Sequence, residues 1–177
     1  MKRRLAVIAL AIGGASSAGA ADDLYTRYFA GVNGGRPCYA RSYDEAHLKA
    51  HPKQQVRRIA VDFDVNERSD PATKNSGADF QAGVSFMLKR SPEWYGQALA
   101  CKTAGDRFEC YLEADGGAFT LIPRGEALRL EITGGKDSDI HAEGEKDFGS
   151  FGGPGSDDRV FILPRTDRKI CDSIWPK

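Results

Sequence analysis

The sequence predicts a mainly β protein with one short helix, built as a small antiparallel barrel or sandwich and tied by disulfides. Apolar and polar residues alternate in short runs between 79 and 132, for example from Phe80 to Leu88, which is typical of half-buried strands. Turn residues recur about every ten positions. In addition, Cys101 and Cys110 stand on either side of one such turn.

The alternation predicts seven strands, joined mostly by tight turns such as the hairpin turn at 103–107. They are expected at 56–65, 79–90, 95–102, 107–113, 118–123, 128–133 and 159–163. The last run is apolar on both faces, which indicates a strand that is central or closes the sheet. Residues 136–158 lack this periodicity and are expected to be loop-like.

The sequence also contains two candidate helices. Ser42 and Glu45 form a capping-box pattern that predicts a helix over 43–50, ending before Pro52. Apolar residues between 24 and 29 have helical spacing, and a docking helix and a flexible arm are both open there. The expected organisation is a signal peptide at 1–20, an arm or short helix at 21–37, and a single β domain at 38–177.

The first 20 residues have the pattern of a secretory signal peptide. Basic residues at 2–4 precede an apolar run at 5–12, and Ala18 and Ala20 form a small-residue cleavage site. A twin-arginine signal at residues 3–4 is the alternative, which the surrounding residues disfavour. The apolar run is shorter than the roughly 20 residues that span a bilayer. We therefore expect a periplasmic or secreted chain from Ala21, with no transmembrane segment.

The chain without its signal peptide carries little net charge. Three of the 25 basic residues lie in the signal peptide, which leaves 22 against 25 acidic residues. Nucleic acids and anionic membrane surfaces select a basic field, so the near balance argues against both. A protein, peptide or glycan partner is expected instead.

Four cysteines in an exported chain are expected to form two disulfides, for which three pairings exist. The alternation around 101–110 directs both sulfurs to one face, so we expect Cys101–Cys110 together with Cys38–Cys171. A zinc site is disfavoured, because the spacing of the hairpin pair is too long and no His lies near either cysteine in sequence.

One acidic segment is a candidate metal site, with possible ligands at every second position: Asp137, Asp139, His141 and Glu143. This spacing resembles positions 1, 3, 5 and 7 of a calcium loop. Ala142 stands where such a loop needs Gly, and Phe148 where it needs a bidentate Glu, so an EF-hand is excluded. A looser calcium site and a solvated strand face both stay open, and no other cofactor is expected.

Two further pairs of residues are candidate chemical sites. His47 and His51 have metal-ligand spacing, but two exposed histidines on a surface helix are the simpler interpretation. Asp62 and Asp64 form an acidic pair that needs a partner across a cleft for glycoside hydrolysis. The sequence contains no nucleophile elbow, phosphate loop or Cys–His arrangement, so no catalytic residue is predicted.

Three aromatic residues, Trp94, Tyr95 and Trp175, are candidates for a platform that binds a sugar or a peptide. Packing at the rim or in the core is the alternative for each of them. The runs 38–52, 115–119 and 157–161 resemble small exported proteins from alphaproteobacteria that have no assigned activity. That resemblance implies secretion and a single domain, and it implies no site residues.

The sequence therefore favours a secreted binding or inhibitor-type module that presents loops from a rigid β scaffold. Its contact surface is expected at Trp94 or Tyr95, or in the loop at 134–157. The alternatives are a metal-dependent hydrolase that uses residues 137–143 and a structural envelope protein.

Overall fold

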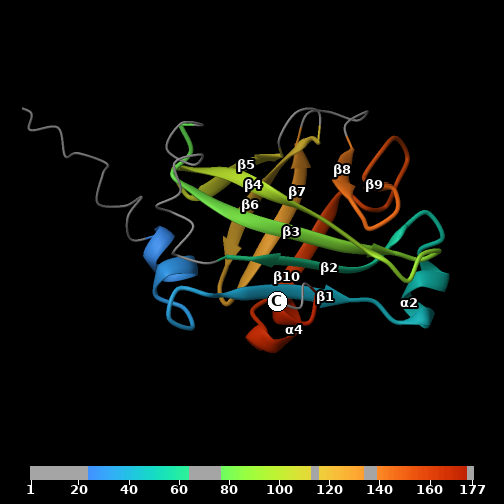
Figure 1. Cartoon of the computed structure of the whole chain (residues 1–177), viewed down its shortest axis with the longest axis horizontal. Coiled ribbons are helices and arrows are strands. Elements are labelled where there is room, and N and C mark those ends of the chain that lie inside the picture. Colours follow the sequence, from blue (N-terminus) through green and yellow to red (C-terminus); the bar gives the residue numbers. More distant parts are fainter. Residues whose placement is uncertain (1–23, 64–76, 113–115, 134–138, 175–177) are drawn as a thin grey trace, which may run out of the picture.

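A computed structural model gives the structure of residues 24–63, 77–112, 116–133 and 139–174. Within these ranges, ten antiparallel strands form one sheet (Figure 1). The strands are β1 (Cys38–Ser42), β2 (Val56–Asp62), β3 (Phe80–Leu88), β4 (Trp94–Ala104), β5 (Arg107–Leu112), β6 (Ala118–Arg124), β7 (Ala127–Thr133), β8 (Ile140–Glu143), β9 (Phe148–Phe151) and β10 (Val160–Pro164). The helical segments are η1 (Thr26–Ala30), α2 (Glu45–Ala50) and α4 (Arg168–Asp172).

The sheet curls into a nearly closed barrel, which decides between the predicted barrel and sandwich. Strands β1 to β7 pair in chain order, and β10 pairs with β7. The two ends of this order meet, because Tyr39 of β1 forms a bridge with Arg165, just beyond β10. Strand β10 thus closes the barrel as predicted. The strand is apolar on both faces, but its outer face is not covered by other described residues, since Val160 and Ile162 are 45% and 46% exposed.

All seven predicted strands are present, but the sequence does not predict β1, β8 and β9. The expectation of a loop over 136–158 is wrong at 140–143 and 148–151, where a hairpin pairs with β4 through Gly96 and Glu143. Ile140 and Phe151 of this hairpin are buried. Runs of four or five residues that contain Gly and Ser carry too little alternation to be recognised. Here the neighbouring strand β4 supplies the hydrogen-bonding partner.

The barrel interior is filled by the inward residues of the strands and by η1. Every second residue from Phe80 to Phe86 of β3 is buried. Phe29 of η1 enters the same core, where its ring centroid lies 4.9 Å from that of Phe80 and 5.0 Å from that of Phe108. Of the two interpretations of residues 24–29, the docking helix is therefore the correct one.

Helix α2 begins two residues later than predicted. Ser42 is the last residue of β1 and pairs with Arg58, so its backbone belongs to the sheet and cannot cap a helix. Asp44 takes that role: its Oδ1 accepts a hydrogen bond from the His47 amide at 2.7 Å. The capping-box prediction was wrong in its N-cap residue, because the sequence pattern did not predict the strand β1 that includes Ser42.

Both predicted disulfides are present. The Cα atoms of Cys38 and Cys171 are 5.9 Å apart, and those of Cys101 and Cys110 are 4.1 Å apart. Two disulfides indicate an oxidising, extracytoplasmic environment. In the part of the chain that the structure describes, no helix is long and apolar enough to cross a membrane.

Candidate functional site

Two hollows follow each other along the outer face of β4. Successive side chains of a strand point to opposite faces, so Trp94, Gly96 and Ala98 share one face of β4, opposite the buried Tyr95 and Leu99. Gly96 and Ala98 line a hollow of about 420 Å³, whereas Trp94 lines a second hollow of about 680 Å³. Helix α4 borders the first hollow through Cys171 and Asp172. Ile174, just beyond α4, borders the second hollow.

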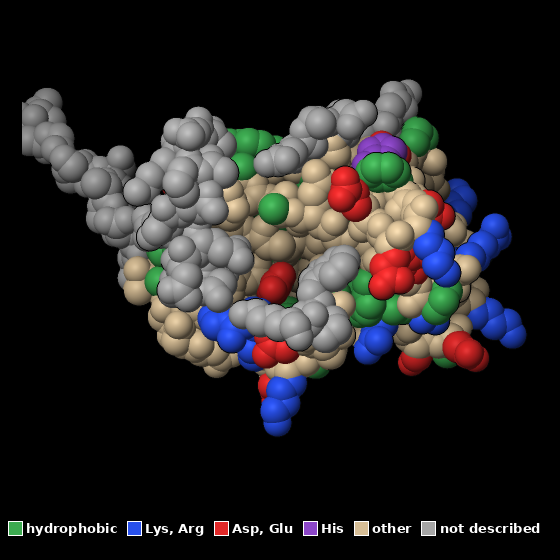
Figure 2. Space-filling model, viewed as in Figure 1, with side chains coloured by type: hydrophobic (Ala, Val, Ile, Leu, Met, Phe, Trp, Pro, Cys, Tyr) green, Lys and Arg blue, Asp and Glu red, His purple; other side chains and the backbone are tan. Residues whose placement is uncertain are grey.

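The first hollow has a floor of small residues. Strand pairing sets Gly83 beside Ala98 and Ser85 beside Gly96. The small side chains at these four outward positions leave an open space. Further along the same two strands, the larger side chains of Met87 and Trp94 pair with each other and fill the corresponding space. Figure 2 shows few charged or large apolar side chains at the centre of this face, and acidic and basic ones mainly below it and to its right.

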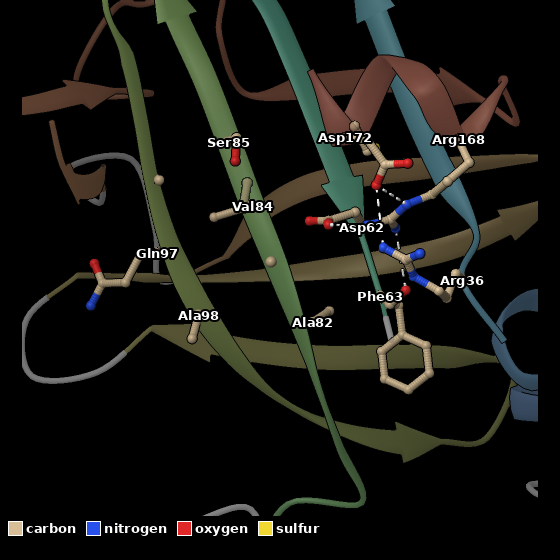
Figure 3. A pocket seen from close by; sticks show the side chains of 13 residues that line it. Arg36, Asp62, Phe63, Ala82, Val84, Ser85, Gln97, Ala98, Arg168 and Asp172 are labelled. Atoms are coloured by element: carbon tan, nitrogen blue, oxygen red, sulfur yellow. Dashed lines mark hydrogen bonds and ion pairs between the residues drawn. The ribbon is translucent and has the colours of Figure 1, made fainter. Parts of the chain in front are cut away.

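One wall of the first hollow is a network of charged residues beside α4 (Figure 3). Arg168 donates from Nη2 to Asp62 at 3.4 Å and from Nε to Asp172 at 2.8 Å. Its Nη1 donates to the backbone carbonyls of Pro37 and Phe63, both at 3.4 Å. The Arg168 guanidinium is therefore occupied by protein acceptors, and it joins α4 to β2.

Asp172 of α4 is shared between two cations. Besides Arg168, it accepts a hydrogen bond from Arg36 Nη2 at 3.2 Å. The disulfide from Cys38 to Cys171 ties the same helix to β1. Two arginines and two aspartates thus hold the wall in place, with balanced formal charges.

Asp62 is the wall residue that projects over the floor. It pairs with Gly83 across the β2–β3 ladder, and its Oδ1 would stand 2.6 Å from a Cβ on residue 83. Its Oδ2 faces Arg168. Burial raises the pKa of the Asp62 carboxyl above its ordinary value, although Arg168 lowers it. Asp62 is therefore a partly desolvated carboxylate at the edge of a cavity.

The second hollow combines an indole with charged groups. Trp94 lies beside Pro92 and Glu93, and Glu145 and Lys146 reach the same hollow from the β8–β9 turn. Glu93 Oε1 accepts a hydrogen bond from the Lys146 amide at 3.0 Å, which joins the two turns. The structure thus brings Trp94 together with part of the predicted contact loop.

The predicted aromatic platform is wrong for Tyr95. This residue is 4% exposed and its ring lies 5.5 Å from that of Phe86 in the core. Neighbouring residues of a strand point to opposite faces, so Trp94 and Tyr95 cannot contact one ligand together. Trp175 lies outside the described residues.

The acidic segment is partly described. His141 Nε2 lies 3.0 Å from Asp139 Oδ1, and both side chains are partly exposed. Alternation sets Glu143 on the same face of β8 as His141. No group of three or more possible metal ligands occurs among the described residues. Asp137 lies outside them, so the calcium site stays a prediction.

The histidine pair belongs to a stack of rings on α2. The His47 ring lies 4.6 Å from that of Tyr43 and 4.4 Å from that of His51. His47 Nε2 is 3.0 Å from Gln54 Oε1. The pair packs on the surface of the helix, as the simpler interpretation expects. Asp64, the second carboxylate of the other candidate pair, lies outside the described residues.

Sequence reasoning missed the charged wall of the first hollow. Arg36, Asp62, Arg168 and Asp172 come from three separate regions of the chain. The alternation of β2 and β3 does place Asp62 and Gly83 on outward faces. Only the strand register shows that they are neighbours.

The comparisons with known proteins add no family. No family model matches the sequence, no curated protein matches it, and no solved structure matches the fold. The resemblance to exported alphaproteobacterial proteins therefore stays a prediction.

Proposed function

We propose that this protein is an exported binding module whose ligand-binding surface is the outer face of β4 beside α4. The observation that carries the proposal is the succession of two hollows along residues 92–98. At about 3.3 Å per strand residue, this stretch is about 20 Å long. An elongated ligand can lie along it and reach the charged wall and Trp94 together.

The chemistry of the surface favours an extended segment of a partner protein. Its polar groups include guanidinium, carboxylate and ammonium groups, and Trp94 adds an aromatic ring. A polypeptide offers complements to all of these, and small floor residues let its backbone approach closely. Strand β4 already pairs with β3 along its length. The ligand therefore lies across the face and is not added as a further strand.

The scaffold is suited to binding because it is ordered before the ligand arrives. The Cys38–Cys171 disulfide and Arg168 hold α4 against β1 and β2. A rigid surface loses little conformational entropy when it binds. An inhibitor is included in this proposal, since it is a binding module whose partner is an enzyme.

Site-specific cross-linking tests the proposal. A photoreactive amino acid replaces Ala98, on the floor of the first hollow, and Ile162, an exposed control on β10. After illumination in the envelope of cells that export the protein, we expect an adduct from position 98 only. Trp94→Ala should reduce its yield about tenfold, as expected for an aromatic anchor. Equal adducts from both positions, or none from 98, would refute the proposal.

A further inference from the structure

We propose that the first hollow receives the ammonium end of a lysine side chain of the partner, bound by Oδ1 of Asp62. The inference rests on the proposed function, because it names one group that the same surface recognises. The cavity of about 420 Å³ has room for a side chain. Its floor of Gly83, Ser85, Gly96 and Ala98 carries no cation.

Asp62 directs one carboxylate oxygen over the floor of this cavity. Its Oδ2 faces Arg168, whose guanidinium donates to four protein acceptors. Its Oδ1 points away from Arg168 (Figure 3). This oxygen lies over Gly83, 2.6 Å from where a Cβ on that residue would stand. Among the described residues, the side chain that donates a hydrogen bond to Asp62 is Arg168, and it does so at Oδ2. A cation entering the hollow therefore meets the open side of this carboxylate.

The same geometry favours lysine over arginine. A guanidinium binds a carboxylate best through two parallel hydrogen bonds, one to each oxygen. Arg168 already occupies the Oδ2 side of Asp62, so a second guanidinium can use one oxygen only. An ammonium group is a point charge that needs a single acceptor. Water in the open hollow satisfies its remaining donors.

The energetic state of Asp62 supports a cationic ligand. Desolvation raises the pKa of this carboxyl despite the nearby Arg168, so the charged form is under-stabilised in the unbound protein. Among the described residues that line the hollow, Arg36 and Arg168 balance Asp62 and Asp172 in formal charge. An ammonium group bound at Oδ1 replaces part of the favourable interaction with water that the carboxylate loses through burial.

The test uses small probes and the full exported chain. N-acetyl-lysine methylamide is compared with its norleucine and arginine analogues, which differ at the end of the side chain. Binding is followed by nuclear magnetic resonance shifts of the amides of Gly83, Gly96 and Ala98. We expect saturable shifts with the lysine probe, shifts about tenfold weaker in affinity with arginine, and none with norleucine.

Three variants locate the effect. Asp62→Asn should abolish the lysine shifts, and Gly83→Ala should weaken them because its Cβ displaces the carboxylate. Asp157→Asn, at an exposed acid elsewhere, should leave them unchanged. The unfolding temperature of each variant shows whether it is folded. If Asp62→Asn does not fold, Gly83→Ala still tests the site, because it displaces the Asp62 carboxylate without removing its charge.

The outcomes separate this inference from the proposed function. Equal shifts with norleucine, or no shifts with lysine at the highest soluble concentration, overturn the lysine site. If position 98 still gives a partner adduct in that case, the binding module stands without it. If lysine binds through Asp62 and position 98 gives no adduct, the lysine site stands and the extended-segment proposal falls.

Discussion

Asp62 and Gly83 face each other across the β2–β3 ladder, and the carboxylate occupies the place of the missing side chain. A Cβ on residue 83 would lie 2.6 Å from Asp62 Oδ1. The small size of residue 83 thus matters to the neighbouring strand, whereas its own backbone has an ordinary φ. This relationship links the shape of the first hollow to the position of its acidic group.

Gly83→Ala should therefore depend on residue 62. With Asp62 present, we expect a loss of about 1 kcal/mol or less in the free energy of unfolding, because a flexible carboxylate can move aside. In an Asp62→Ala background the clash is absent, and the substitution should be neutral or stabilising by about 0.4–1 kcal/mol. A double-mutant cycle in urea measures the difference. Equal effects in both backgrounds contradict the contact.

Gly149→Ala should destabilise the β8–β9 hairpin. A Cβ there would lie 2.5 Å from Cγ of Tyr95, whose ring is packed in the core. Overpacking of this kind costs about 1–3 kcal/mol, measurable by urea denaturation. Ser150→Ala, on the exposed neighbour in β9, is the control and should change stability by less than about 0.5 kcal/mol. Equal losses in the two variants argue against the ring contact.

The two disulfides should differ in their contribution to stability. They join residues 133 and 9 positions apart. Loop entropy alone predicts a loss of about 5 kcal/mol for Cys38→Ala with Cys171→Ala, and about 2.5 kcal/mol for Cys101→Ala with Cys110→Ala. Chemical denaturation of the two double variants tests the order. A larger loss from the hairpin pair is inconsistent with the loop-entropy account.

Two carboxyls, the buried Asp158 and the partly buried Asp62, should make stability depend on pH. Burial raises the pKa of Asp62 and of Asp158, the latter despite hydrogen bonds from the Gln55 and Val56 amides. A raised pKa means that the folded state holds the proton more tightly than the unfolded one. Their contribution to the free energy of unfolding therefore falls as pH rises from about 4, the ordinary carboxyl value, through the raised pKa.

Paired variants isolate this dependence. Asp158→Asn should flatten the curve of unfolding free energy against pH above about 4. Asp157→Asn, its exposed neighbour, should leave the slope as it is. An Asp158→Asn curve with the wild-type slope rules out a contribution from the buried carboxyl.

The exported protein should begin at Ala21 and carry no free thiol. The cleavage site at Ala18–Ala20 predicts the first residue, and all four cysteines are paired. Intact-mass measurement of protein recovered after export, with and without reductant before alkylation, checks both points. Alkylation without reductant is the informative control, since any added mass indicates an unpaired cysteine.

The local pattern of the sequence determined most of the fold. The alternation in β2 to β7 predicted strands, inward residues and the hairpin disulfide, because a pleated strand sends successive side chains to opposite faces whatever its partner is. The short strands β1, β8 and β9 were not predictable in this way. They depend on pairing with β2 and β4, which stand elsewhere in the chain.

The candidate site was decided by tertiary structure. The pattern marks Asp62 and Gly83 as outward residues, and it separates Trp94 from Tyr95 once strand periodicity is applied strictly. It cannot show that Arg168, 106 positions away, lies beside Asp62. That proximity follows from strand register, from barrel closure and from the Cys38–Cys171 disulfide, which are set by packing of the whole core. Periodicity is a property of consecutive residues, whereas a cavity wall is assembled from residues that only folding makes neighbours.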